Sequence, residues 1–451
     1  MESPAPVLIK NGLVVSSTGT QLGDVLMADG RVAAVGPSLH HPDAVAIDAT
    51  GQFVMPGLID IHVHFRDPGG TYKEDFASGT RSALAGGFTT IVDMPNTSPP
   101  TASRDALVTK ETIAAEKAYC DYGFWFGATP DNVREAATVG TEFGLPIVGL
   151  KLYMGSSTGS LLVDDTDPMY RHFATFPRNR LLAVHAEDES VMRLFASLPG
   201  NAHNRHRPPL AAALAVTRAL HMAHHLGRRI HIAHLSTGAE LSEVILARER
   251  GTHVTCEVAP HHLYLTEADQ ERWGSRGKVN PPLRSSDDVE SLWAGLQHID
   301  IIATDHAPHT IEEKNAEYQT APSGLPGLET SLGLMYQGVR AGRLTIERLV
   351  HMMSTGPADL ISARAKGRID VGADADVVLF DPQQRWTVEG DRLETRSAWS
   401  PWEGTTITGK VSRVFLRGQE MVRDGAVCAV AGTGRPLSLT LPAELGTPPG
   451  R

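Results

Sequence analysis

The feature that most constrains the fold of this chain is a repeated alternation between short apolar runs and amphipathic stretches. From Leu58 onward, runs rich in β-branched and aromatic residues are separated by segments with helical spacing of apolar residues. This alternation is typical of parallel strands joined by crossover helices. The runs lie at residues 58–64, 88–96, 122–129, 147–154, 181–188, 229–236, 253–260 and 299–308. Eight strands in about 250 residues predict an α/β chain with a TIM-like (β/α)8 barrel.

The two ends of the chain have a different pattern. Residues 1–56 and 367–432 contain short alternating strands with turn signals such as Asn-Gly and Asp-Gly. Because isolated hairpins are only marginally stable, we expect both ends to pair into one small β-sandwich, with the barrel of residues 57–366 inserted between them. Residues 433–451 are rich in Pro and Gly, and we expect a loosely held tail there.

Composition limits the classes of ligand that we expect the chain to bind and the cellular location that we expect for it. The chain has 41 Lys and Arg against 52 Asp and Glu, a formal charge of −11, which disfavours a nucleic-acid surface and favours a small-molecule substrate. No run of 18 apolar residues occurs and the N-terminus lacks a cationic signal region, so we expect no membrane span and a cytoplasmic protein. The three cysteines are isolated, which argues against disulfides or a thiolate zinc site.

A pair of histidines ends the first predicted barrel strand, in the sequence Ile61-His62-Val63-His64. Side chains two apart on a strand project to one side, and at the C-terminal end of a barrel strand that side faces the mouth, where active sites lie. The spacing suits metal binding. Two histidines on a strand can equally be partly buried structural residues, so the remaining strands must decide.

Four other predicted strands end in further candidate ligands. His185 and His234 lie near the ends of the fifth and sixth strands, and Asp305 follows the eighth. Lys151 lies in the fourth strand, where a buried ammonium is costly. Carboxylation by CO₂ would convert it to an anionic carbamate able to bridge two cations; the alternative is a lysine that reaches solvent by snorkelling. Six such residues at the ends of five strands favour a metal centre over coincidence.

Several segments resemble those of dihydroorotases in the cyclic amidohydrolase superfamily. They occur in the family's order between about Met55 and Leu332: PGLIDIHVHFRDPG, KLYMGSSTG, VHAED, HIAHLSTG, KVNPPLR, ATDHAPHT and APSGLPGLETSL. The resemblance implies a binuclear zinc barrel that interconverts L-dihydroorotate and N-carbamoyl-L-aspartate in pyrimidine biosynthesis. Some bacterial members carry Asp in place of the bridging Lys, whereas Lys151 here stands in a lysine-type context.

The resemblance also implies roles for the candidate ligands. One zinc is expected on His62, His64 and Asp305, and the other on His185 and His234. Carboxylated Lys151 and a hydroxide are expected between the two ions. Hydrolysis of an unactivated amide needs such a nucleophile, because metal coordination can lower the pKa of water to about 7. Asp305 is expected to act as the general acid/base.

Substrate identity is expected to depend on different residues. In dihydroorotases the positions of Arg66, Asn96 and His309 hold the substrate's α-carboxylate, for which the planar guanidinium is well suited. Each also has a structural alternative: a surface ion pair of Arg66 with Asp67 or Asp75, an Asx turn at Asn96, and a helix cap or ligand-supporting donor at His309. Asn280, Pro322 and Gly324 lie in stretches that resemble those contacting the substrate ring.

Two other classes of function remain open. An allantoinase or hydantoinase would share the fold and every metal ligand, but a neutral ring would not need the three carboxylate-binding residues together. A non-catalytic homologue would be expected to have lost metal ligands, and all six are present. The resemblance further suggests a homodimer and an association with aspartate transcarbamoylase.

Overall fold

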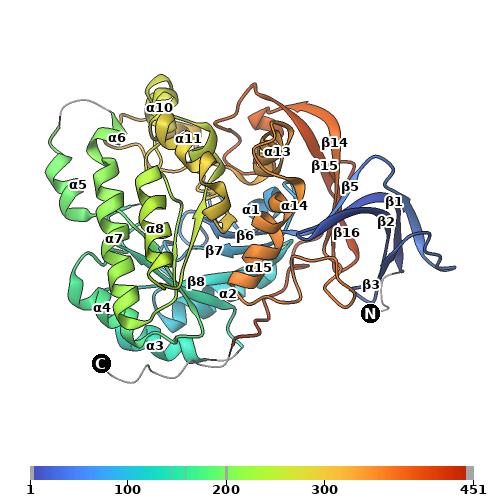
Figure 1. Ribbon diagram of the computed structural model, residues 1–451, viewed down its shortest axis with the longest axis horizontal. Helices are drawn as coiled ribbons and strands as arrows, with labels where there is room; N and C mark the ends of the chain where they lie inside the picture. Colours follow the sequence, from blue (N-terminus) through green and yellow to red (C-terminus); the bar gives the residue numbers. More distant parts are fainter. Residues whose placement is uncertain (1–4, 143, 158, 199–201, 443–451) are drawn as a thin grey trace.

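The computed structural model describes residues 5–142, 144–157, 159–198 and 202–442, and in it the predicted barrel is confirmed (Figure 1). Its strands are parallel and follow one another in chain order around the sheet. They are β6 (Leu58–Val63), β7 (Phe88–Asp93), β8 (Asp121–Gly127), β9 (Ile147–Tyr153), β10 (Leu181–His185), β11 (Ile230–Ile232), β12 (Val254–Val258) and β13 (Ile301–Ile302).

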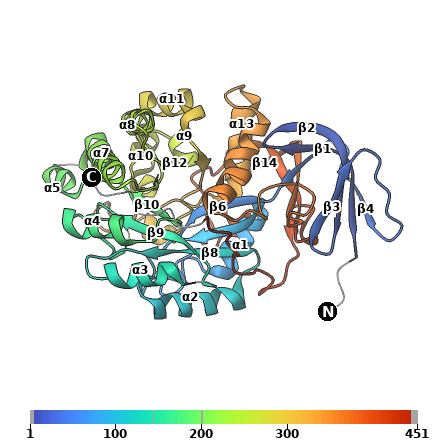
Figure 2. The same cartoon turned by 60° about the horizontal axis from the view of Figure 1, so that its bottom comes forward.

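Helices follow the barrel strands and cover the outside of the barrel (Figures 1 and 2). The longer ones are α1 (Phe76–Ala85), α2 (Arg104–Lys117), α3 (Val133–Thr141), α4 (Thr166–Thr175), α7 (Pro209–Leu226), α8 (Gly238–Glu249), α11 (Ser286–Ala294) and α13 (Leu328–Arg340). The shorter ones are α5 (Glu189–Phe195), α6 (His203–His206), α9 (Pro260–Tyr264), α10 (Glu267–Trp273), α12 (Ile311–Lys314), α14 (Ile346–Val350) and α15 (Gly356–Leu360). Local sequence determines where these helices begin and end. A capping box of Thr237 and Glu240 starts α8, and Gly227 in the left-handed conformation ends α7.

The lower interior of the barrel is filled with side chains. Ile59, Ile61, Val92, Trp125 and Val148 are buried in one apolar cluster. The indole Nε1–H of Trp125 donates to the carbonyl of Ile61 at 2.8 Å, which anchors the strand that carries the two histidines. Because this layer is packed, ligands have room only at the C-terminal ends of the strands.

The barrel closes at a seam between β13 and β6 that side chains hold together. The ladder there is short, because β13 has two residues and the parallel contact with β6 is an isolated bridge between Val63 and His306. The carboxylate of Asp60 accepts hydrogen bonds from the backbone N–H of Thr304 at 3.2 Å and from its hydroxyl. The backbone N–H of His64 donates to the carbonyl of His306 at 2.8 Å. These bonds hold the strand of the two histidines beside the segment that carries Asp305.

The two terminal segments pair with each other, as expected, and together they form one nine-stranded sheet (Figure 2). Antiparallel pairing of β5 with β14 joins them, with Met55 opposite Val378. The N-terminal strands are β1 (Val7–Ser16), β2 (Gly19–Ala28), β3 (Arg31–Gly36), β4 (Val45–Asp48) and β5 (Phe53–Pro56). The C-terminal strands are β14 (Val377–Thr387), β15 (Thr406–Leu416), β16 (Gln419–Arg423) and β17 (Ala426–Val427).

The beginning of the Pro/Gly-rich tail differs from the expectation. Residues 443–451 lie outside the described part of the chain, but the preceding residues are held against the barrel. The backbone N–H of Tyr122 donates to the carbonyl of Arg435 at 3.0 Å, and that of Leu437 donates to the carbonyl of Tyr122 at 2.8 Å. Leu437 is buried in the same apolar cluster as the barrel interior. A loosely held tail is therefore wrong for this stretch, because its backbone and one leucine find partners at the start of β8.

A buried ionic cluster joins the sheet to the barrel. The ammonium of Lys366 contacts three carboxylates, those of Asp121, Asp376 (2.8 Å) and Asp374 (3.0 Å). Arg417 also pairs with Asp121. Because Asp121 belongs to β8 and the other two carboxylates precede β14, this cluster links the two parts of the molecule through one ammonium.

We predict that Lys366→Met lowers the free energy of unfolding by about 3 kcal/mol or more, because three carboxylates lose their shared buried cation. The matched control is Arg31→Met. Arg31 also pairs with Asp374, but its side chain is 53% exposed, so its loss should cost less than about 1 kcal/mol. Denaturant unfolding measures both. Equal losses in the two variants would contradict the role given to Lys366.

Candidate active site

The six predicted metal ligands converge at the mouth of the barrel. Five of them line one cavity with about 340 Å³ of empty volume: His62, His64, His185, His234 and Asp305. His62, His64 and Asp305 each bring a possible ligand atom within 4.8 Å of the others. The Oδ1 atom of Asp305 lies 3.0 Å from Nε2 of His64 and 3.4 Å from Nε2 of His62.

Neighbouring oxygen atoms orient the first two imidazoles. The Nδ1–H of His64 donates to Oδ1 of Asn96 at 2.6 Å, and that of His62 donates to the buried carboxylate of Glu257. Glu257 also accepts from Nε2 of His231 at 3.0 Å. With Nδ1 occupied in this way, Nε2 of both ligand histidines faces Asp305. This arrangement of a carboxylate or carbonyl behind a ligand imidazole is typical of metal sites.

The second pair of histidines is oriented in a similar way. Nε2–H of His185 donates to Glu187 at 3.0 Å, and Glu187 in turn pairs with Arg207. Nδ1 of His185 lies 2.9 Å from Nε2 of His234, so the two nitrogens meet inside the cavity. His234 and Asp305 have φ values of +33° and +49°, a left-handed conformation that non-glycine residues adopt mainly at functional sites.

Lys151 is buried beneath the cavity. Its side chain is inaccessible to solvent, so the alternative of a snorkelling lysine is wrong. Within the described residues its Nζ atom has no hydrogen-bond partner. Burial lowers the pKa of Lys151 to about 8, against the opposing effect of Glu257 and Asp305. A buried amine without a partner at this position is the kind of group that a bound cation or a covalent change must complete.

Arg66 points into the cavity rather than to the surface. It is buried, its Nε donates to the carbonyl of Pro308 at 3.2 Å, and its Nη2 lies 3.1 Å from Nε2 of His309. Asp67 and Asp75, the surface partners considered above, pair with Lys117 and Arg396 instead. The ion-pair alternative for Arg66 is therefore wrong. Its guanidinium faces the cavity and contacts no carboxylate among the residues that the structure describes.

His309 and Asn96 lie beside Arg66. His309 is buried, with Nε2 at 3.0 Å from the carbonyl of Ser323 and Nδ1 at 3.1 Å from Nζ of Lys73. It does not cap a helix, because Thr310 is the N-cap of α12. Burial and the cations Arg66 and Lys73 keep the pKa of His309 well below its usual value, so the ring is neutral. Asn96 lines the cavity and orients His64, which is more than an Asx turn requires.

The predicted ring-contact residues divide into two groups. Asn280 and Gly324 line the cavity with the metal-ligand candidates. Pro322 does not: it lines an adjoining outer hollow, and its carbonyl accepts a hydrogen bond from Nζ of Lys314 at 3.0 Å. Gly324 has a φ of +146°, and a Cβ there would lie 2.3 Å from the carbonyl of Ala307. Only glycine fits at this part of the wall.

Three residues of the site were not among the predicted ones. Asp60 holds the barrel seam and Glu257 orients His62. Tyr153 lines the cavity, and its buried hydroxyl has no hydrogen-bond partner among the described residues. A signal exists for each: Asp60 is two residues before His62, Tyr153 is two residues after Lys151, and Glu257 is an acid inside an apolar strand. Because side chains alternate along a strand, the two-residue spacing places Asp60 on the face of His62 and Tyr153 on the face of Lys151. Glu257 belongs to a strand of the barrel wall.

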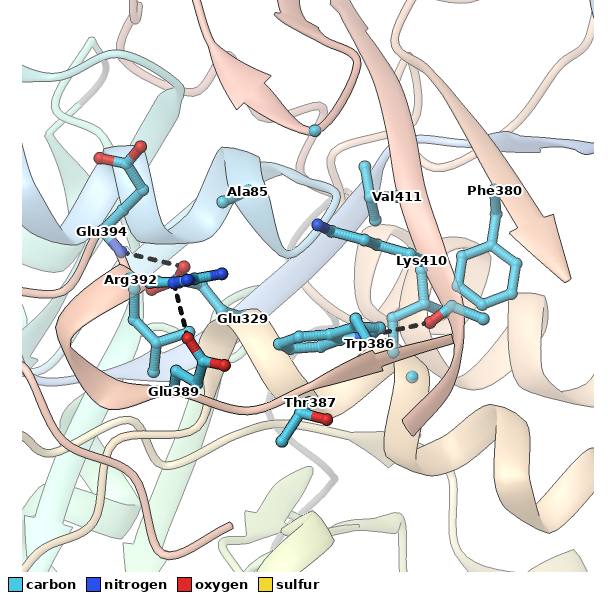
Figure 3. Close-up of a pocket in the computed structure, with 15 residues that line it drawn as sticks. Ala85, Glu329, Phe380, Trp386, Thr387, Glu389, Arg392, Glu394, Lys410 and Val411 are labelled. Atoms are coloured by element: carbon cyan, nitrogen blue, oxygen red, sulfur yellow. Dashed lines mark hydrogen bonds and ion pairs between the residues drawn. The ribbon is translucent and has the colours of Figure 1, made fainter. Parts of the chain in front are cut away.

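A second hollow lies between the barrel and the terminal sheet, where α13 faces β14 and β15 (Figure 3). Several of its polar groups have partners. The carboxylate of Glu329 accepts from the backbone N–H of Glu394 at 3.0 Å, and Arg392 pairs with Glu389. The Trp386 indole donates to the carbonyl of Gly409 at 3.1 Å. This hollow contains none of the candidate ligands, and we assign no chemistry to it.

The residues of the first cavity fit divalent metal ions. Imidazole nitrogens and a carboxylate are the donors that zinc and related ions prefer. Nδ1 of His185 and Nε2 of His234 point toward each other although the two imidazoles do not form an ion pair. Among the described residues, Nζ of Lys151 has no hydrogen-bond partner. One ion could lie between His62, His64 and Asp305, and a second beside His185 and His234, with Lys151 near both.

Comparison with known proteins identifies the family. The amidohydrolase family model matches residues 53–167 and 174–421. The chain belongs to the amidohydrolase family. A dihydroorotase from Pyrococcus horikoshii is 37% identical over 377 residues, which cover 84% of this amidohydrolase and 82% of that protein. The multifunctional protein CAD from Squalus acanthias is 37% identical over 86% of this chain, which spans only 16% of its length. The resemblance to dihydroorotases is confirmed.

Solved structures support the same fold. An L-hydantoinase (dihydropyrimidinase) from Arthrobacter aurescens matches with a TM-score of 0.90 at 32% identity, over 95% of this chain and 98% of that one. The protein is therefore an enzyme of the cyclic amidohydrolase type, and a non-catalytic homologue is disfavoured because all six candidate ligands lie together at the mouth.

We predict that Glu257→Gln weakens metal binding about 10- to 100-fold, because a neutral amide no longer orients His62 and His231 as a carboxylate does. The control is Glu240→Gln, since Glu240 is equally buried but caps α8 and touches no candidate ligand. Metal content after dialysis against graded chelator concentrations measures the effect. Equal metal retention in both variants would rule out the role of Glu257.

Proposed function

We propose that this amidohydrolase is a dihydroorotase that interconverts L-dihydroorotate and N-carbamoyl-L-aspartate. The observation that carries the proposal is the presence of Arg66, Asn96 and His309 in or beside the cavity that holds the ligand cluster. A guanidinium with no carboxylate partner in the described structure is suited to bind the carboxylate of a substrate. The similarity to dihydroorotases supports the same reaction.

Two divalent ions, zinc by family expectation, belong to the proposal. His62, His64 and Asp305 would hold one, His185 and His234 the other, and Lys151 as a CO₂-derived carbamate would bridge them. When bound, such ions lower the pKa of water and polarise the carbonyl under attack. The buried, unpartnered Nζ of Lys151 and its lowered pKa support the carbamate, because a neutral amine is the form that reacts with CO₂.

The side chains of the protein divide the remaining work. Arg66, with Asn96 and His309, would orient the substrate through its α-carboxylate, and Asn280 and Gly324 would contact the ring. Asp305 would take the proton of the attacking water and return it to the ring nitrogen as the C–N bond breaks. Its place within 3.0 to 3.4 Å of the His64 and His62 imidazoles supports this role.

The second candidate is a hydantoinase, favoured by the structural match to the Arthrobacter enzyme. That match extends over the shared barrel, which both functions require. The buried Arg66 favours an anionic substrate, because a neutral ring would supply no carboxylate to contact its guanidinium.

Location and assembly are inferred from the family. We propose a homodimer in the cytoplasm and an association with aspartate transcarbamoylase, which the similarity to CAD supports. In the described part of the chain, no helix is long and apolar enough to cross a bilayer.

The proposal predicts a substrate-dependent effect of Arg66→Met. On dihydroorotate, kcat/KM should fall about 10- to 100-fold, because a charged hydrogen bond to the carboxylate is lost. On hydantoin, which lacks the carboxylate, the change should be far smaller. Steady-state assays of both enzymes on dihydroorotate, hydantoin and allantoin measure this. Faster turnover of hydantoin or allantoin than of dihydroorotate by the natural enzyme would favour the alternative function.

A second prediction concerns the metal centre. Purified protein should hold close to two divalent ions per chain, and Lys151→Ala should lose most of the metal and the activity. Short-chain carboxylic acids should restore part of the activity if they replace the bridging carbamate. Elemental analysis and rate measurements test this, and full metal occupancy with near-normal rates in Lys151→Ala would refute the bridge.

A further inference from the structure

Lys314 is a fully buried lysine beside the active-site cavity. Its Nζ donates to three carbonyl oxygens, those of Lys278 at 2.7 Å, Pro322 at 3.0 Å and Gly324 at 3.0 Å. An ammonium has three N–H groups, and all three are used here. The side chain therefore ties the segment before Asn280 to the glycine that lines the cavity.

Lys278 holds the same part of the cavity lining in place from its outer side. Its Nζ donates to the carbonyls of Tyr318 and Ala321, both at 2.8 Å. Its own carbonyl accepts from the backbone N–H of Gly324 at 3.0 Å as well as from Lys314. Two lysines thus organise residues 318–324, which we call the lysine-held wall, through main-chain oxygens alone.

In the described part of the chain, no carboxylate is in direct contact with the charges of this region. Among the described residues, neither Lys314 nor Lys278 nor Arg66 has a carboxylate oxygen within 4.0 Å. Two other buried lysines do: Lys110 pairs with Asp93, and Lys366 contacts three acids. Burial of Lys314, followed by the effects of Lys278 and Arg66, lowers its pKa. An anion that entered the cavity would relieve the mutual repulsion of these cations.

We propose that Lys314 determines specificity: its buried ammonium, with that of Lys278, makes the lysine-held wall electropositive and selects cavity ligands that carry a carboxylate. Direct contact with the ligand is not required, because a charge acts across several ångströms of protein interior. Lys314 would act through the Gly324 carbonyl and through the field at Arg66. Since this role belongs to the carboxylate subsite, it rests on the proposed function.

The experiment compares two ligands that share one ring and differ in the charge of its substituent, orotate and its uncharged methyl ester, on the metal-loaded enzyme. In Lys314→Met, the inhibition or dissociation constant of orotate should rise about tenfold, as expected for loss of one unit charge about 10 Å away at an effective dielectric constant of about 20. The constant of the ester should change less than about twofold. A merely structural lysine would weaken both ligands equally.

Two further variants keep the outcome clear. Lys278→Met removes the half-buried member of the pair and should weaken orotate about threefold, with the ester again unaffected; it replaces Lys314→Met if that variant does not fold. Lys366→Met removes another buried lysine, which pairs with Asp121 at the first residue of β8 and does not line the cavity, and it should leave the orotate-to-ester ratio unchanged.

The possible results separate the two levels of the proposal. Equal weakening of both ligands in the Lys314 and Lys278 variants, or unchanged orotate binding, would overturn the role of the lysines. Failure of the natural enzyme to prefer orotate over its ester would overturn it as well. The proposed function is tested separately, by turnover of the natural enzyme on dihydroorotate.

Discussion

The closure of the barrel by the Asp60 side chain is the interaction on which the rest of the site depends. The last strand has only two residues in the ladder, so backbone pairing alone holds the seam weakly. Asp60 bonds to both donors of Thr304 and to the backbone N–H of His62 at 3.0 Å. Burial raises its pKa to about 7, which is the cost of placing a carboxylate in the barrel wall. The same hydrogen bonds hold two strands that are far apart in sequence side by side, so that His62 and Asp305 lie close together.

The ligand cluster depends on a layer of acids behind it. Glu257 and Glu187 each hold an imidazole from the side away from the cavity, and each is itself held, by His231 and by Arg207. Such supports limit the rotation of the rings before any ion binds. The same buried acids supply negative charge around the imidazoles and Lys151, and this negative charge favours the binding of cations.

Charge is distributed unevenly over the molecule. The junction of barrel and sheet gathers three carboxylates around Lys366. Beside the cavity, by contrast, Arg66, Lys278 and Lys314 contact carbonyl oxygens and the His309 imidazole and, among the described residues, no carboxylate. The first arrangement is complete in itself and stabilises the fold. We propose that an anionic ligand completes the second, which links the carboxylate of the substrate to the wall around Gly324.

The order of strands and the six candidate ligands could be predicted from the sequence, because both follow from local periodicity: apolar runs mark strands, and residues two apart at a strand end share the mouth. Tertiary structure decided, or alone confirmed, three further features. Pro322 lies outside the inner cavity, Leu437 packs under the barrel, and β5 pairs with β14. The contacts of Glu257 and Lys314 were also decided by tertiary structure. Their partners lie between 8 and 195 residues away along the chain. No local sequence pattern records whether a buried charge meets a carboxylate, an imidazole or only carbonyl oxygens.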